Sequence, residues 1–119
     1  MYELLFWKYE EGVYLNHHEV YEALDDNEAV EGLELLQVDV IVNRINSVFS
    51  KWERVDDNSW KNNEGPGAFC VKTTPNSVKI ECYGTAGSTM DKLVDVLDEY
   101  KCPLYDPQVP QRYDEMYEG

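Results

Sequence analysis

A stripe of apolar residues recurs every three or four positions between Val38 and Trp52. Such spacing places the apolar side chains on one side of an α-helix of about four turns, whose other side is polar. The stripe consists of Val38, Ile41, Val42, Ile45, Val48, Phe49 and Trp52. A helix of this kind gains its stability from packing, so the chain has to supply another layer that covers the stripe.

Residues 68–83 supply that layer. Two stretches rich in β-branched and aromatic residues flank Pro75 and Asn76, which are typical turn residues, and they predict a hairpin of 68–74 with 77–83. Its apolar face consists of Phe69, Val71, Thr73, Val78, Ile80 and Cys82. Cys70 falls on the opposite face from Cys82, which excludes a disulfide between them. On that face Lys72 opposes Lys79, a like-charge pair that requires an acidic neighbour.

Three further elements follow from the same periodicities. Residues 3–9 predict a first strand with both faces covered. Asn16, three residues before Glu19, predicts the cap of a short helix whose inward residues are Val20, Tyr21 and Leu24. Ser88 or Thr89 is expected to cap a second core helix, which carries Met90, Leu93, Val94 and Leu97 and ends before Pro103.

The remaining segments have no clear periodicity of apolar residues. Residues 56–67 predict a polar loop that contains Trp60, and residues 102–106 are expected to add a short last strand. Residues 107–119 predict a C-terminal tail with two alternatives: its prolines favour an extended, mobile route, and its tyrosines favour packing on the sheet.

Together these elements predict a single α+β domain over residues 1–119, in which two core helices pack on one face of a small antiparallel sheet. The order of elements is compatible with a ferredoxin-like β-α-β-β-α-β plan that carries an extra short helix. The sequence leaves the strand order open.

The charge balance disfavours some classes of binding partner. The chain has 24 Asp and Glu against 10 Lys and Arg, a net charge of −14, which opposes binding to nucleic acid or to an anionic membrane. Disorder is not expected, because 43% of the residues are hydrophobic. The chain has no long apolar run and its first residues lack the features of a signal peptide, so we expect a cytoplasmic protein with reduced cysteines.

The sequence offers no catalytic constellation. His17 and His18 are adjacent instead of four residues apart, so they do not predict a metal pair on a helix. The turn at 84–89 lacks the Gly-Lys-Ser/Thr ending of a phosphate-binding loop, and a glycine turn followed by a helix cap is the simpler interpretation. We therefore expect no enzyme, no catalytic residues, no cofactor and no metal.

The most unusual feature is the distribution of charge. No basic residue lies between Lys8 and Arg44, where ten carboxylates repel one another. This segment is either a solvated acidic face that keeps the protein soluble or a docking surface for a basic protein, and we weigh the two about equally. The candidate contact residues are Glu19, Glu22, Asp25, Asp26, Glu28, Glu31 and Glu34, with Trp60 as an aromatic anchor.

Other aromatic residues lie off the helical stripes and are further candidate anchors, of which we expect about two at an interface. They are Tyr14, Tyr21, Tyr83, Tyr105 and Tyr113.

The opening segment ELLFWKY at 3–9 and the closing segment CPLYDPQ at 102–108, in a small acidic α+β chain, resemble the immunity proteins of bacterial contact-dependent growth inhibition and related polymorphic toxin systems. The resemblance implies a cytoplasmic protein that binds a cognate C-terminal toxin domain and covers its active site. Many such toxins are nucleases with basic grooves, which an acidic surface would match. Interface residues are not carried over, because that surface varies within the family.

Two alternatives stay open beside this interpretation. One is a small ligand-binding domain or enzyme that uses the 84–89 turn and Cys70, and the other is a cytoplasmic regulatory adaptor. The toxin's identity and the oligomeric state are not specified by the sequence.

Overall fold

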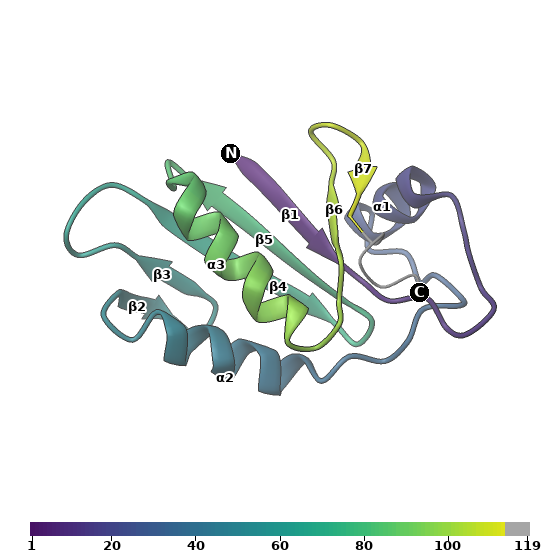
Figure 1. The fold of residues 1–119 in the computed structure, drawn as a ribbon, viewed down its shortest axis with the longest axis horizontal. Coiled ribbons are helices and arrows are strands. Elements are labelled where there is room, and N and C mark those ends of the chain that lie inside the picture. The colour runs from purple at the N-terminus through teal and green to yellow at the C-terminus, as the bar shows by residue number, and fades with distance from the viewer. Residues whose placement is uncertain (114–119) are drawn as a thin grey trace.

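Seven strands form one antiparallel sheet in the order β2-β3-β4-β5-β1-β6-β7 in the computed structural model, which describes residues 1–113 (Figure 1). The elements in chain order are β1 (Tyr2–Phe6), α1 (His17–Asp25), α2 (Val38–Val48), β2 (Glu53–Asp56), β3 (Ser59–Lys61), β4 (Ala68–Thr74), β5 (Ser77–Tyr83), α3 (Gly87–Asp98), β6 (Leu104–Asp106) and β7 (Gln111–Arg112). The α+β class is therefore confirmed.

The β4–β5 hairpin has the predicted register. Phe69 pairs with Cys82, Val71 with Ile80 and Thr73 with Val78. Lys72 and Lys79 face each other as expected, and each has an acidic neighbour: Lys72 contacts Glu81, and Lys79 contacts Glu3 and Asp25. These carboxylates remove the repulsion that the like-charge pair would otherwise create.

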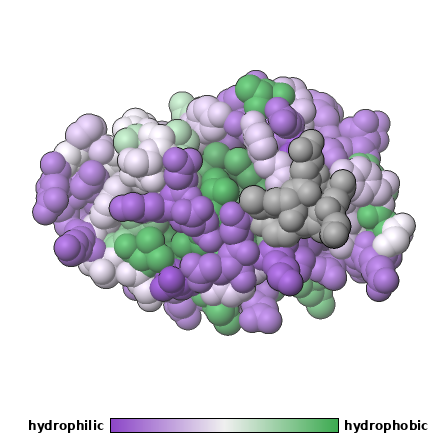
Figure 2. All heavy atoms as spheres, in the orientation of Figure 1, coloured by the Kyte–Doolittle hydropathy of each residue, from purple (hydrophilic) through white to green (hydrophobic). Residues whose placement is uncertain are grey.

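The two core helices α2 and α3 pack on one face of the sheet, as predicted (Figure 1). The buried residues of this layer include Leu4, Phe6, Ile41, Ile45, Val71, Val78, Ile80, Leu93 and Leu97. Arg44 of α2 donates two hydrogen bonds to Glu99, just after α3, at 2.9 and 3.2 Å. On the part of this face that is coloured in Figure 2, apolar residues form separate patches among hydrophilic ones.

The first helix, α1, lies on the opposite face of the sheet. Val20 packs there with Leu5 and Trp7 in a second buried cluster that also contains Leu33 and Tyr105. Because Leu4 and Phe6 belong to the first cluster, β1 is covered on both faces, as predicted. The predicted cap is also present: the Asn16 side chain accepts a 3.1 Å hydrogen bond from the Glu19 N–H.

Three predictions of local structure are wrong. Residues 53–61 form the hairpin of β2 and β3 within and beside the predicted loop. The long helix ends at Val48 and does not reach Trp52. The helix α3 begins at Gly87 after Ala86, and neither Ser88 nor Thr89 caps it.

The end of the chain folds back on the sheet. Within the predicted tail, β7 pairs with β6, while residues 114–119 lie outside the described residues. Gln108 fastens the turn between them: its side chain accepts from the Glu3 N–H at 2.7 Å and donates to the Glu3 carbonyl at 2.9 Å. The Gln108 side chain thus bonds both the N–H and the carbonyl of one residue of β1, as the backbone of a neighbouring strand does.

The succession β1, α2, β4, β5, α3, β6 follows a β-α-β-β-α-β order, and these strands lie as β4-β5-β1-β6. The helix α1 and the β2–β3 hairpin are additions to that order. The ferredoxin-like assignment itself stays a prediction.

Replacing Asn76 by alanine should lower the free energy of unfolding by about 1–3 kcal/mol, because two hydrogen bonds of ordinary strength are lost. The Asn76 side-chain amide donates to the carbonyls of Leu33 and Glu34, each at 3.2 Å, and so fastens the acidic segment to the hairpin turn. Urea denaturation measures the change. Asn43→Ala, at an exposed position on α2, is the control, and an equal loss in both variants would contradict the fastening role.

Candidate functional site

The acidic face of α1 follows from helical spacing. Glu19, Glu22 and Asp26 are three, four and seven residues apart, so they project from one side of α1 and its C-cap, and all three are exposed. Asp25 projects toward the sheet instead and contacts Lys79. The helix thus separates three solvent-facing carboxylates from one that holds it in place.

The segment after α1 continues the acidic surface. Asn27 adopts a left-handed conformation, with φ of 60°, which turns the chain, and the Glu28 N–H donates to the Ala23 carbonyl at 2.8 Å. Glu28 and Glu31 are exposed in this loop. Farther on, the Glu34 N–H donates to the Lys8 carbonyl at 2.8 Å, so backbone hydrogen bonds hold both ends of the loop.

Three of the seven predicted carboxylates have partners. Asp25 lies 2.7 Å from the Lys79 ammonium, Glu34 lies 3.2 Å from the Lys8 ammonium, and Glu22 lies 3.0 Å from His18 Nε2. The contact of Glu22 is an ion pair only when His18 is protonated.

The other four carboxylates, Glu19, Asp26, Glu28 and Glu31, have no cationic partner among residues 1–113. The last turn of α1 also has no basic residue, although carboxylates at a helix C-terminus meet the negative end of the helix dipole. The structure therefore places four carboxylates without a cationic side-chain partner on α1, its C-cap and the loop that follows it.

Trp60 does not belong to this surface, and its prediction as an aromatic anchor is corrected. Its side chain is 1% exposed in β3 and stacks on Phe69 with ring centroids 5.2 Å apart. Its indole N–H donates to Asn46 Oδ1 at 3.1 Å. Trp60 is a core residue because the β2–β3 hairpin, which the sequence did not predict, turns it toward the helices.

Tyr14 is an aromatic residue three positions before the start of α1, and it is 62% exposed. It lies in the loop that leads into α1, and its hydroxyl is 3.2 Å from His17 Nε2. Leu15 beside it is 37% exposed and was not predicted, because a single leucine in a loop carries no periodic signal. Of the other candidate anchors, Tyr83 and Tyr113 are exposed, Tyr21 is half-buried and Tyr105 is buried.

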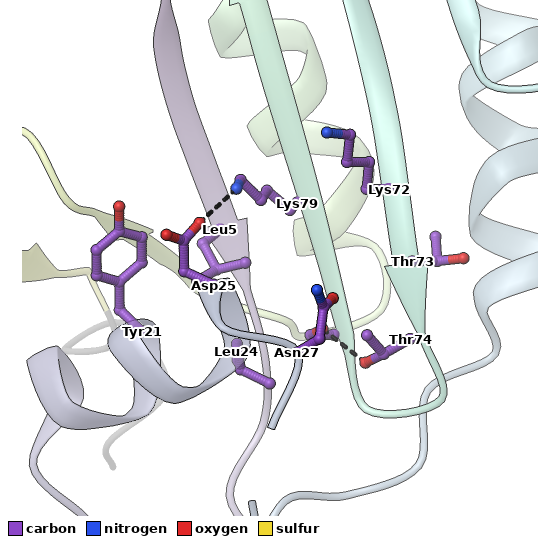
Figure 3. A pocket seen from close by; sticks show the side chains of 10 residues that line it. Leu5, Tyr21, Leu24, Asp25, Asn27, Lys72, Thr73, Thr74 and Lys79 are labelled. Atoms are coloured by element: carbon purple, nitrogen blue, oxygen red, sulfur yellow. Dashed lines mark hydrogen bonds and ion pairs between the residues drawn. The ribbon is translucent and has the colours of Figure 1, made fainter. Parts of the chain in front are cut away.

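A hollow of about 160 Å³ separates α1 from β4 and β5 (Figure 3). Lys79 projects into it and contacts Asp25 at 2.7 Å and Glu3 at 3.4 Å. Burial of Lys79 disfavours its charge, but the hydrogen bond to Asp25 and the charges of Glu3 and Asp25 outweigh this effect and raise the pKa of Lys79. Because Lys79 contacts Glu3 of β1 and Asp25 of α1, the ion pairs in this hollow hold α1 to the sheet.

The alternative site consists of the 84–89 turn and Cys70. Neither of them lines the hollows of about 160, 260 and 320 Å³ that lie among the described residues. Burial raises the pKa of the Cys82 thiol, and it raises the pKa of Cys102 to about 12, which disfavours the reactive thiolate of both.

The two histidines contact tyrosines. His17 Nδ1 is 2.8 Å from the Tyr9 hydroxyl, and His18 Nδ1 is 2.8 Å from the Tyr105 hydroxyl. Within residues 1–113, no three or more His, Cys, Asp and Glu side chains are grouped so that they could hold a metal ion. We therefore assign the histidines to the packing between α1 and the sheet.

No model of a known protein family matches the chain, and no curated protein shows significant similarity to it. Among the described residues, no helix has the length and apolar character needed to cross a bilayer.

Tyr21 should titrate late and report on the attachment of α1. Burial and the hydrogen bond that its hydroxyl donates to Glu3 at 2.9 Å raise the pKa of Tyr21 from 10.0 to about 12. A pKa raised in the folded state stabilises the fold below about pH 10, and this contribution is lost as the pH rises through 12. In an absorbance titration of tyrosinate, Tyr21→Phe should remove one late-titrating group, and the stability difference between variant and wild type should shrink above pH 10.

The hydrogen bond of Tyr2 to Asp106 also raises a tyrosine pKa to about 12, so Tyr2→Phe is the matched control. It should remove a different late-titrating group without affecting α1. An unchanged high-pH titration in Tyr21→Phe would contradict the contact with Glu3.

Proposed function

We propose that this chain is an immunity protein that binds a cognate toxin domain in the cytoplasm and neutralises it by covering its active site. The toxin domain is expected to be basic, and a nuclease is the class that fits best. The resemblance of the two end segments supports this proposal, and so does the net charge of −14.

The observation that carries the proposal is the grouping of Glu19, Asp26, Glu28 and Glu31 without cationic partners in the described chain. Like charges that are held close together destabilise a fold, and a basic partner relieves the repulsion. Asn76 donates to the carbonyls of Leu33 and Glu34, which holds the end of the loop that carries Glu28 and Glu31 to the body of the protein.

An array of carboxylates also suits a nuclease groove, whose Lys and Arg side chains bind phosphates. The charges would increase the rate of encounter, while a few apolar or aromatic residues supply most of the affinity. Tyr14 and Leu15 are exposed beside the N-terminus of α1 and can serve as such anchors.

The test is growth of a bacterium that expresses the C-terminal domain encoded immediately upstream, with and without this chain. We expect growth to stop with the domain alone and to recover when this chain is present. A harmless upstream domain, or a failure to restore growth, would contradict the proposal. In that case thermal-shift screening of small ligands tests the alternative of a ligand-binding domain.

A further inference from the structure

A second hollow, of about 320 Å³, lies beside the C-terminal end of α1. One wall comes from the end of α1 and the loop after it, and the other comes from the turn of the β4–β5 hairpin. Its lining residues are Leu24, Asn27, Glu28, Ala29, Val30, Leu33, Thr74, Pro75 and Asn76. This volume is at the lower limit of ligand-binding clefts, about 300 Å³, so it suits one long side chain better than a cofactor.

The chemistry of the lining combines an apolar floor with a negative rim. Leu24, Val30 and Leu33 provide the apolar surface, and Glu28 provides a carboxylate that has no cationic partner in the described part of the chain. The C-terminus of α1 adds the negative end of a helix dipole, with no basic side chain in its last turn. Lysine and arginine side chains match such a surface, because their stems are apolar and their ends are cationic.

Asn76 favours arginine over lysine. Its side-chain N–H groups are used by the carbonyls of Leu33 and Glu34, while its side-chain oxygen accepts no hydrogen bond from the described residues. A guanidinium group presents five N–H donors in one plane, so it can donate to two acceptors at once, whereas an ammonium group is a compact point charge. Glu28 and Asn76 both line the hollow and offer two such acceptors.

We propose that this hollow binds an arginine side chain that projects from the surface of the basic partner. The inference rests on the proposed function, since it names the group by which that partner is anchored. It places the anchor at the loop of residues 27–33, on the opposite end of α1 from Tyr14 and Leu15.

The test uses the isotope-labelled full chain and three acetylated, amidated tripeptides, Gly-Arg-Gly, Gly-Lys-Gly and Gly-citrulline-Gly. Citrulline has the shape of arginine without its charge. In an NMR titration, the arginine peptide should shift the amide signals of Leu24, Asn27, Val30 and Leu33, with affinity about tenfold higher than that of the citrulline peptide. Two results on affinity would overturn the proposal: equal affinity for the arginine and citrulline peptides, or equal affinity for the arginine and lysine peptides. Shifts of amide signals near all the carboxylates, instead of near the hollow, would also overturn it.

Glu28→Gln should weaken binding of the arginine peptide about tenfold, because it removes one charge-assisted pair. Glu31→Gln removes the same charge from the same loop but does not line the hollow, so it should leave binding nearly unchanged. Equal weakening by both variants would overturn the proposal.

The peptide titration and the growth assay test different proposals. Restored growth without binding of the arginine peptide would overturn this inference alone. Binding of the peptide without restored growth would contradict only the proposed function.

Discussion

Replacing Trp60 by alanine should lower the free energy of unfolding by about 3–5 kcal/mol, the range observed when a buried aromatic side chain is truncated. The indole is 1% exposed, stacks on Phe69 at an angle of 17° between the ring planes, and donates a hydrogen bond to Asn46. Alanine removes the stacking surface and leaves a cavity between β3 and α2. Denaturation by urea, followed by far-ultraviolet circular dichroism, measures the loss.

Trp60→Phe is the matched control, because it keeps an aromatic ring against Phe69 and loses the hydrogen bond and part of the volume. We expect a smaller loss of about 1–3 kcal/mol. If Trp60→Ala unfolded like the wild type but failed to bind the partner, Trp60 would have the role of an exposed anchor, as predicted from the sequence, and the burial found here would be contradicted.

The elements that the sequence predicted well are those in which local pattern and tertiary burial agree. The β4–β5 hairpin alternates apolar and polar residues on both sides of Pro75 and Asn76, so one register alone places Val71 and Ile80 on the same face. The core helices repeat apolar residues every three or four positions, and Ile41, Ile45, Leu93 and Leu97 are all buried.

The β2–β3 hairpin was not predicted because it lacks such a pattern. All four residues of β2 are exposed, and three of them, Glu53, Arg54 and Asp56, are charged, as is common in an edge strand that must not aggregate. Its turn is formed by Asp56, whose side chain accepts from the Asn58 N–H at 2.8 Å, and this signal is equally typical of a loop. A strand of this kind is defined by pairing with β4 through β3, which is a tertiary property.

The sequence predicted where the carboxylates of the candidate site lie along the chain, but not which of them have partners, because pairing is also a tertiary property. The absence of basic residues between Lys8 and Arg44 is visible in the sequence, but the neutralising partner of Asp25 is 54 residues away. Packing of α1 on the sheet decides that Asp25 meets Lys79, while Asp26, one residue later, meets solvent. The seven carboxylates are therefore equivalent in the sequence. In the fold, three of them contact a basic side chain, and the other four have no such contact within residues 1–113.

Replacing Glu19, Asp26, Glu28 and Glu31 together by lysine should slow association with the toxin domain that we propose as the partner by about 10- to 1,000-fold at low salt, the range by which electrostatic steering raises association rates. Stopped-flow fluorescence measures the rate. The matched control reverses four exposed carboxylates elsewhere, Glu53, Asp57, Asp91 and Asp95, so that both variants have the same net charge. Equal slowing in the two variants would show that total charge, and not this surface, governs the encounter.

The dependence of the association rate on salt distinguishes electrostatic steering from a loss of folded protein or of contact area. Association of the wild type should slow steeply between 0.01 and about 0.15 M salt, because the Debye length falls from about 30 Å to about 8 Å and screens the exposed carboxylates. The lysine variant should show little slowing over that range or even a slight acceleration, since repulsion from a basic partner is screened in its turn. Circular dichroism should match between the variants, because the four replaced side chains have no ion pairs to lose within the described chain. A wild-type rate that did not change with salt would contradict electrostatic docking, because charges exposed on α1 and its loop cannot act through that much screening.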